Sequence, residues 1–260
     1  MNPIAIELGP VNITWYAIFI VTGLLIGAFI GAKEANKHGI ENDDFYDMLF
    51  YLLIFSFVGA RLWYVLFDGY LIDHLKNPIE FIQVWNGGLA IHGGIVGGAS
   101  YLLYYSNKRK LNPLILTDVA APSLILGQAI GRWGNFVNSE AHGGPTTYEF
   151  LSDKLHLPDF IVNGMYINGT YYQPTFLYES IWNIIGFIII MTVLRPRFRN
   201  NYGIISGFYL MWYGFIRVFI EMMRTDALML GPIKVAQLTS LTMFIIGLFL
   251  LIWKKGEINE

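Results

Sequence analysis

The sequence predicts an all-α polytopic membrane protein with seven transmembrane helices and an extracytoplasmic arm between the fourth and fifth helices. Hydrophobic residues make up 55% of its 260 residues, charged residues only 14%, and the mean hydropathy is +0.48. An ordinary soluble chain carries about 25% charged residues. Seven apolar segments are long enough to cross, or nearly cross, a hydrocarbon core of about 30 Å. Because a single pass through lipid must satisfy its own backbone, each segment is expected to be a helix.

The seven apolar segments are separated by polar connections. The first should be a retained helix, because the first eleven residues lack the Lys and Arg with which a cleavable signal peptide begins. Gly23, Gly27 and Gly31 follow one another at four-residue spacing, which favours close helix packing. The third segment is the shortest and the richest in glycine. The segments span roughly 13–35, 45–67, 89–105, 114–136, 175–194, 203–223 and 233–253.

Basic residues predict the orientation of the chain. Alternate connections carry ten Lys and Arg on one side and four on the other. Because cytoplasmic loops are enriched in Lys and Arg, the N-terminus is expected outside and the C-terminus in the cytoplasm. We therefore expect one membrane-embedded domain over 1–260, with an outer arm at about 139–174. In that arm, Asn163-Gly164 and Asn168-Gly169 flank residues 165–167 and Thr170–Tyr172 follows, a pattern that indicates a short β-hairpin or arm.

With this orientation, ionisable and polar residues from six segments collect in the outer third of the bilayer. Such groups are costly at membrane depth and usually face a protein interior or a water-filled cavity. Several have a plainer interpretation: Arg217 with Glu221 as a structural pair within one helix, His92 as a packing histidine, and Tyr16 as an interfacial aromatic. Arg61 and Glu179 could be site residues or could simply form ion pairs with other buried charges. The set is Tyr16, Arg61, His92, Arg132, Asn135, Glu179, Arg217, Glu221 and Arg224.

These residue types favour the binding of an anionic lipid headgroup. Two arginines form a bidentate clamp for phosphate, and histidine and glutamate can move protons. The chain has no cysteine, which excludes disulfides, cysteine-bound metals and a cysteine nucleophile of its own. The sequence contains no P-loop, no Ser-His-Asp arrangement, no zinc spacing and no pattern typical of nucleic-acid binding. We expect membrane lipid as a partner and no nucleic acid.

The segment 131–143, Gly-Arg-Trp-Gly-Asn-Phe-Val-Asn-Ser-Glu-Ala-His-Gly, resembles the signature of the bacterial phosphatidylglycerol–prolipoprotein diacylglyceryl transferases. The similarity extends to Gly-Gly-Leu-Ala-Ile-His-Gly-Gly at 87–94 and to Gln-Pro-Thr-Phe-Leu-Tyr-Glu at 173–179. It also includes Arg-Val-Phe-Ile-Glu-Met-Met-Arg at 217–224. The resemblance therefore covers essentially the whole chain.

The resemblance implies an enzyme of the bacterial plasma membrane. It would transfer the diacylglyceryl group of phosphatidylglycerol to the lipobox cysteine of a preprolipoprotein, forming a thioether and releasing glycerol phosphate. No metal or organic cofactor is implied. His92 is the expected base and Glu140 the alternative, while Arg132 and Arg217 would stabilise the leaving phosphate. The expected catalytic residues are His92, Arg132, Glu140 and Arg217, and the expected substrate-binding residues are Tyr16, Arg61, Asn135, Gly143 and Glu221.

A transporter or flippase for an anionic lipid or metabolite is the competing hypothesis. It would use the same outer arginines, and it would also need a polar path to the cytoplasmic side. The inner halves of the spans, such as 184–193 and 241–252, are nearly all apolar, which argues against such a path. A purely structural membrane protein would leave the clustered intramembrane charges unexplained.

Overall fold

The seven apolar segments are all helical in the computed structural model, which describes residues 2–9, 11–69, 76–84, 87–225, 229–230 and 233–259. Within those ranges, six helices are long and apolar enough to cross a membrane, and the glycine-rich α4 is not among them. A helical multi-pass protein is confirmed, and seven spans stay a prediction. The main helices are α1 (Trp15–Asn36), α2 (Asn42–Phe67), α4 (Ile91–Arg109), α5 (Pro113–Val137), α7 (Thr175–Ile189), α9 (Ile204–Met223) and α10 (Val235–Asn259).

Shorter elements connect these helices. A π-helical stretch, Ile190–Leu194, and α8 (Arg195–Arg197) continue α7, and a 3-10 helix at Pro78–Phe81 precedes α4. A second π-helical stretch lies at Phe150–Lys154, before the short helix α6 (Asp159–Gly164). The strands are β1 (Ile4–Leu8), β2 (Val11–Thr14), β3 (Pro145–Thr146), β4 (Tyr166–Ile167), β5 (Thr170–Tyr172), β6 (Met229–Leu230) and β7 (Ile233–Lys234). The β1–β2 hairpin was not predicted, and it makes α1 begin at Trp15 instead of residue 13.

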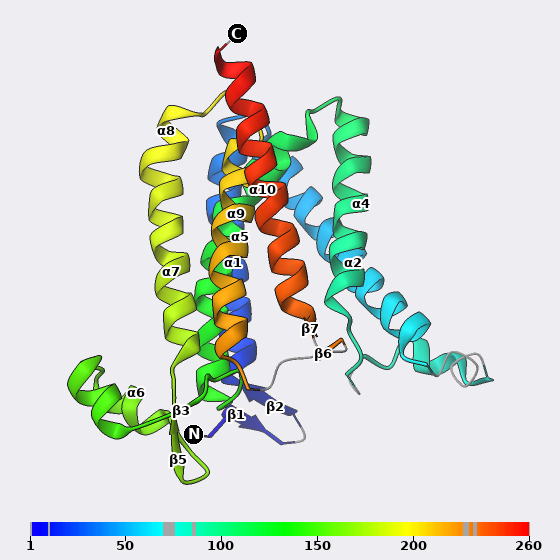
Figure 1. Ribbon diagram of the computed structural model, residues 1–260. Helices are drawn as coiled ribbons and strands as arrows, with labels where there is room; N and C mark the ends of the chain where they lie inside the picture. The colour runs from blue at the N-terminus through cyan, green and yellow to red at the C-terminus, as the bar shows by residue number, and fades with distance from the viewer. Residues whose placement is uncertain are drawn as a thin grey trace. The chain divides into compact units, whose positions relative to one another are not determined.

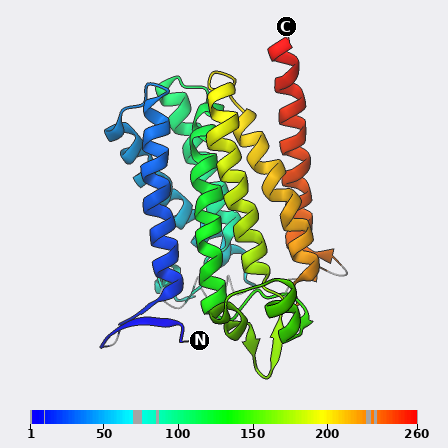
Figure 2. The ribbon, with the colours of Figure 1, turned by 90° about the vertical axis from the view of Figure 1, so that its left-hand side faces the viewer.

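The chain divides into two compact units. The first joins Met1–Gly31 to Thr117–Glu260, and the second is Ala32–Leu116. The single domain expected from the sequence stays a prediction. Within the first unit, the β1–β2 hairpin, the arm and the β6–β7 hairpin lie at one end of the helices, and the C-terminal end of α10 lies at the other (Figures 1 and 2).

Small residues let the helices of the first unit approach one another. A Cβ atom on Gly23 of α1 would lie 3.3 Å from the Cα atom of Gly127 on α5. One turn along, the Ser123 hydroxyl donates to the Gly27 carbonyl at 2.7 Å. Between α9 and α10, a Cβ atom on Gly214 would lie 2.6 Å from the Ser240 carbonyl oxygen. These contacts confirm that glycine spacing in α1 and α5 serves packing.

Helices α7 and α9 are joined by a pair of tryptophans. The Trp182 indole N–H donates to the Trp212 carbonyl at 3.1 Å, and the Trp212 indole N–H donates to the Trp182 carbonyl at 3.0 Å. The two rings stack with centroids 4.3 Å apart. Both indole donors are therefore satisfied within apolar surroundings, as burial of such groups requires.

The arm between α5 and α7 contains a three-stranded antiparallel sheet in the order β3-β5-β4. Asn168 and Gly169 join β4 to β5 with φ of 48° and 86°, the positive values that two-residue hairpin turns require. The predicted hairpin is thus present at this pair. The other pair, Asn163-Gly164, ends helix α6 and forms no hairpin.

A hydrophobic core fixes the arm to the helices. Phe136, near the end of α5, stacks on Phe176, at the start of α7, with ring centroids 4.5 Å apart. Buried residues of the arm pack against this pair, among them Leu151, Ile161 and Met165. The arm is therefore anchored on the two helix ends that carry Arg132 and Glu179.

Candidate active site

Two arginines meet at one buried carboxylate in the first unit. Arg132 of α5 places Nη2 2.9 Å from Oε1 of Glu179, which lies on α7. Arg217 of α9 places Nη1 3.3 Å from Oε2 of the same residue. Glu179 is only 1% exposed, so three helices converge on a carboxylate withdrawn from solvent. The expected approach of the two arginines occurs through this shared partner.

The ionic cluster continues along α9 towards its C-terminal end. Arg217 Nη2 lies 2.9 Å from Oε2 of Glu221, one helical turn later, and Arg224 Nη1 lies 3.7 Å from the same oxygen. The helical pair considered from the sequence is therefore real, but Arg217 also reaches across to Glu179 on α7. Three arginines and two glutamates give this group a net charge of +1.

A chain of hydrogen bonds leads from Arg132 to Glu140. The Arg132 guanidinium donates to the Asn135 amide oxygen at 3.2 Å, and the Asn135 amide donates to Glu140 Oε1 at 2.8 Å. Asn138 donates to the same carboxylate oxygen at 3.4 Å. Unlike Glu179, Glu140 is exposed. It is therefore a solvent-facing carboxylate held in place by two amides.

The backbone around Glu140 is strained. Ser139 and Ala141 both have φ of 56°, in the left-handed region that non-glycine residues rarely adopt. Such residues cost about 1–3 kcal/mol each and cluster at functional sites. A small cavity of about 10 Å³, lined in part by Glu140 and His142, adjoins this turn. That volume is about one water molecule.

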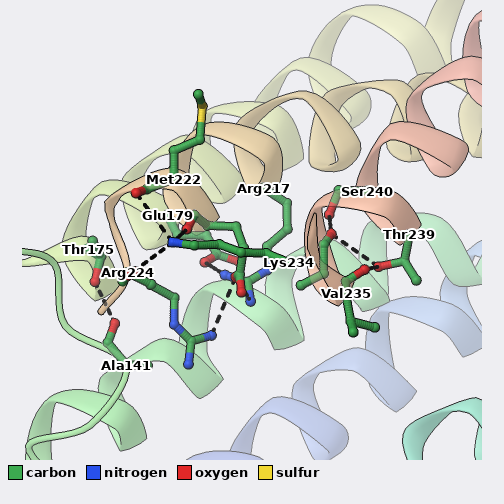
Figure 3. Close-up of polar contacts among 12 residues, drawn as sticks. Ala141, Thr175, Glu179, Arg217, Met222, Arg224, Lys234, Val235, Thr239 and Ser240 are labelled. Carbon is green, nitrogen blue, oxygen red and sulfur yellow. Dashed lines mark hydrogen bonds and ion pairs between the residues drawn. The ribbon is translucent and has the colours of Figure 1, made fainter. Parts of the chain in front are cut away.

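Tyr16 and Gly143 are held by close packing. A Cβ atom on Gly134 would lie 2.6 Å from Cδ2 of Tyr16, so this glycine admits the tyrosine ring beside the 131–143 segment. A Cβ atom on Gly143 would lie 2.9 Å from the Cβ atom of Gln173. Close by, the Thr175 hydroxyl donates to the Ala141 carbonyl at 2.6 Å (Figure 3). These close contacts leave no room for a side chain at positions 134 and 143. The expected substrate contacts of Tyr16 and Gly143 stay predictions.

Arg61 holds a segment of the second unit through backbone carbonyls. Its Nε donates to the Phe81 carbonyl at 3.1 Å, and its Nη1 donates to the carbonyls of Gly87 and Gly88 at 2.8 Å. These bonds favour a structural role, fixing the segment that leads into α4. His92 lies in the first turn of α4 and is exposed. The substrate-binding role of Arg61 and the catalytic role of His92 both stay predictions.

Comparison with known proteins decides the family. A model of the family described as prolipoprotein diacylglyceryl transferase matches residues 3–253. The chain belongs to the prolipoprotein diacylglyceryl transferase family. It is therefore a transferase of lipoprotein biogenesis, and the signature at 131–143 is the segment that carries Arg132, Asn135 and Glu140 in the network described above.

Relatives from staphylococci match nearly the whole of this family member. The protein of Staphylococcus saprophyticus is 48% identical over 257 residues, which cover 98% of the chain and 90% of the relative. That of Staphylococcus xylosus is 46% identical over 256 residues, with 98% and 90% covered. That of Staphylococcus aureus strain MSSA476 is 45% identical over 260 residues, with 100% and 91% covered. Each is named phosphatidylglycerol–prolipoprotein diacylglyceryl transferase, which favours a transferase over a transporter.

Two further residues of this transferase, next to its ionic cluster, were not predicted from the sequence. The Tyr213 hydroxyl accepts a hydrogen bond from Arg132 Nη2 at 3.4 Å, and its position four residues before Arg217 on α9 was a signal that it shares that face. Lys234 is one of the four basic residues on the side with fewer charges and was expected only as a loop charge, yet its ammonium donates to backbone carbonyls at the end of α9. No local pattern around Lys234 indicates this contact.

Proposed function

We propose that the protein transfers the diacylglyceryl group of phosphatidylglycerol to the lipobox cysteine thiol of a preprolipoprotein. The product is a thioether-linked lipoprotein, and glycerol phosphate is released. The observation that carries the proposal is the convergence of Arg132 and Arg217 on Glu179, in a cluster of net charge +1. A phosphodiester carries one negative charge, so its binding neutralises the cluster.

The two arginines have donors to offer a phosphate. A guanidinium has five N–H donors in a planar fork that matches phosphate geometry. Arg132 forms an ion pair with Glu179 through Nη2, and it donates hydrogen bonds to Asn135 from Nη1 and to Tyr213 from Nη2. Glu179 keeps both guanidinium groups oriented before the lipid arrives, which lowers the reorganisation needed during the reaction.

The reaction forms one bond and breaks one bond at the same carbon atom. The thiol loses its proton, and the sulfur attacks the glycerol carbon that carries the phosphate ester oxygen. The carbon–sulfur bond forms as the carbon–oxygen bond breaks, and the electron pair leaves on the oxygen of glycerol phosphate. Arg132 and Arg217 stabilise the charge that grows on this leaving group.

The proton acceptor is His92 or Glu140. A thiol with a pKa of about 8.5 needs only modest assistance at neutral pH. His92 is the base that the family resemblance suggests. Glu140 is supported by its hydrogen-bonded connection through Asn135 to Arg132. Its exposed carboxylate suits a base that must meet a thiol arriving from outside the protein.

The site belongs at the outer leaflet of the bacterial plasma membrane in this proposal. The ten-to-four distribution of basic residues supports an outer N-terminus, a cytoplasmic C-terminus and a seventh span at α4. The ionic cluster lies at the ends of α5 and α9 and the start of α7, the same end from which the arm extends (Figure 2). The arm is then extracytoplasmic, where a lipobox segment emerges.

One assay tests the proposed function directly. The purified protein is incubated with phosphatidylglycerol and a lipobox peptide, and the peptide mass is followed. The expected product is the diacylglyceryl thioether, formed without added metal and in the presence of a chelator. A Cys→Ser peptide should remain unmodified. Absence of any peptide product, together with lipid movement in reconstituted vesicles, would favour the transporter instead.

A further inference from the structure

Helix α9 ends without the usual means of satisfying its C-terminal carbonyls. The last four carbonyls of a helix have no partner within it, and a glycine or a basic side chain in the last turn commonly supplies one. The last turn of α9 contains no basic residue, and the residue that follows, Arg224, is extended with φ of −70° and ψ of 140°. This helix end carries Arg217, Glu221 and Arg224.

Lys234 supplies the missing donors from the next hairpin. Its Nζ donates to the carbonyls of Glu221 at 2.7 Å and Arg224 at 2.8 Å, and approaches the Met222 carbonyl at 3.5 Å. An ammonium has three donors, and three backbone carbonyls surround this one. Figure 3 shows the lysine side chain extended to the helix end, beside Arg217, Glu179 and Arg224. Its positive charge also complements the negative end of the helix dipole.

Lys234 is well placed to fix the register of α9. It ends β7 and directly precedes α10, which packs on α9 closely enough that a Cβ atom on Gly214 would meet the Ser240 carbonyl. At the opposite end of α9, the Asp118 carboxylate accepts from the backbone N–H groups of Gly203 at 2.8 Å and Ser206 at 2.7 Å. Both ends of α9 are therefore held by side chains from other segments.

We propose that Lys234 is a positioning residue for the transferase reaction. By binding the last carbonyls of α9, it sets the rotation and tilt of the turn that places Arg217 against Glu179 and Glu221. It acts through the helix backbone and does not touch the phosphate. This inference rests on the proposed function, because its consequence for turnover requires that Arg217 act on the lipid phosphate. Misplacement of a reacting group by about 1 Å can reduce a rate about 10²-fold.

The test compares Lys234→Met, Lys234→Gln and Lys234→Arg, with Lys154→Met as the matched control on an exposed lysine of the arm. We expect Lys234→Met to lower kcat about 10- to 100-fold with KM for phosphatidylglycerol within about twofold of wild type. Arginine, which keeps charge and donors, should restore most of kcat, and glutamine an intermediate fraction. Lys154→Met should match wild type. Turnover is expressed per folded molecule after gel filtration in detergent.

Two kinetic outcomes would overturn the inference. A rise in KM with unchanged kcat would make Lys234 a direct phosphate ligand, and wild-type values of both constants in Lys234→Met would leave it no role. Hydrogen exchange supplies a readout independent of activity. The Arg224 amide, which donates to the Ile220 carbonyl at 3.1 Å, should exchange faster in Lys234→Met than in Lys154→Met. If wild-type protein yields no thioether, the proposed function fails, whereas unchanged exchange defeats the positioning role itself.

Discussion

Arg132 and Arg217 bind the two oxygens of a single carboxylate, that of Glu179. Their positive charges come from α5 and α9 and are brought together beside a carboxylate that is only 1% exposed, where like charges would otherwise repel. The shared carboxylate is therefore what would allow the proposed two-arginine phosphate site to exist before a phosphate is bound. Removing one partner from such a buried cluster leaves an uncompensated charge, which is strongly destabilising.

The bidentate geometry of the arginines should matter as well as their charge. We expect Arg132→Lys and Arg217→Lys each to lose about 10²-fold in turnover, which is about 2.7 kcal/mol of transition-state stabilisation. Lysine keeps the charge but offers a point contact in place of a planar fork. Turnover is measured per folded molecule, with folded yield scored separately. Near-wild-type turnover in both variants would show that the two arginines do not act as a bidentate phosphate clamp.

Glu179→Gln should reduce stability more than any single change at an exposed carboxylate. The substitution keeps the shape of the side chain but leaves two guanidinium groups without their common anion. Breaking a buried pair in this way costs about 3–5 kcal/mol. Thermal unfolding in detergent checks the loss, with the exposed Glu140→Gln as the control. Equal stability of the two variants would show that Glu179 does not organise the arginines.

The identity of the base can be separated from other roles by pH. Whichever of His92 and Glu140 is the base, its Gln variant should lower kcat at pH 7 and regain most of the loss above pH 9, because a thiol with a pKa of about 8.5 then ionises unaided. His92→Gln should show this recovery only if His92 is the base. The pH profile of kcat for both variants decides between them, and a loss that persists at high pH in both would exclude a base role for either.

Arg61→Lys should act on folding and leave chemistry largely intact. A lysine ammonium cannot reproduce the fork that binds the carbonyls of Phe81, Gly87 and Gly88 together. Folded yield should fall several-fold, while kcat and KM per folded molecule stay within about threefold of wild type. A large rise in KM for phosphatidylglycerol in well-folded protein would instead support the substrate contact predicted from sequence.

The orientation is testable because the chain has no cysteine of its own. Single cysteines at Asn163 in the arm and Asn201 in the connection between α8 and α9 serve as reporters. An impermeant thiol reagent added outside intact cells should label position 163 and leave position 201 unlabelled. The reverse pattern would place the arm, and the site beside it, on the cytoplasmic face.

Helices and the ionic cluster were predictable because both depend on composition. A long apolar run must be helical in lipid, and charges at that depth are rare enough to mark Arg132, Glu179 and Arg217 individually. Backbone carbonyl acceptors, in contrast, cannot be recognised from the sequence, because every residue has one. Arg61 and Lys234 both bind backbone carbonyls, so neither contact could be predicted from residue types. Asn163-Gly164 shows a related limit, since the same dipeptide suits a helix end as well as a hairpin turn.

The Trp182–Trp212 pair has a consequence for how lipid reaches the arginines. Each indole donates to the other's backbone carbonyl, so α7 and α9 cannot separate without breaking both hydrogen bonds and a ring stack in a medium that offers no replacement donors or acceptors. We therefore expect the seam between these two helices to stay closed during turnover. On this expectation a phospholipid diffusing in the plane of the bilayer enters through a different side of the protein, and cross-linking α7 to α9 should leave its entry unimpeded.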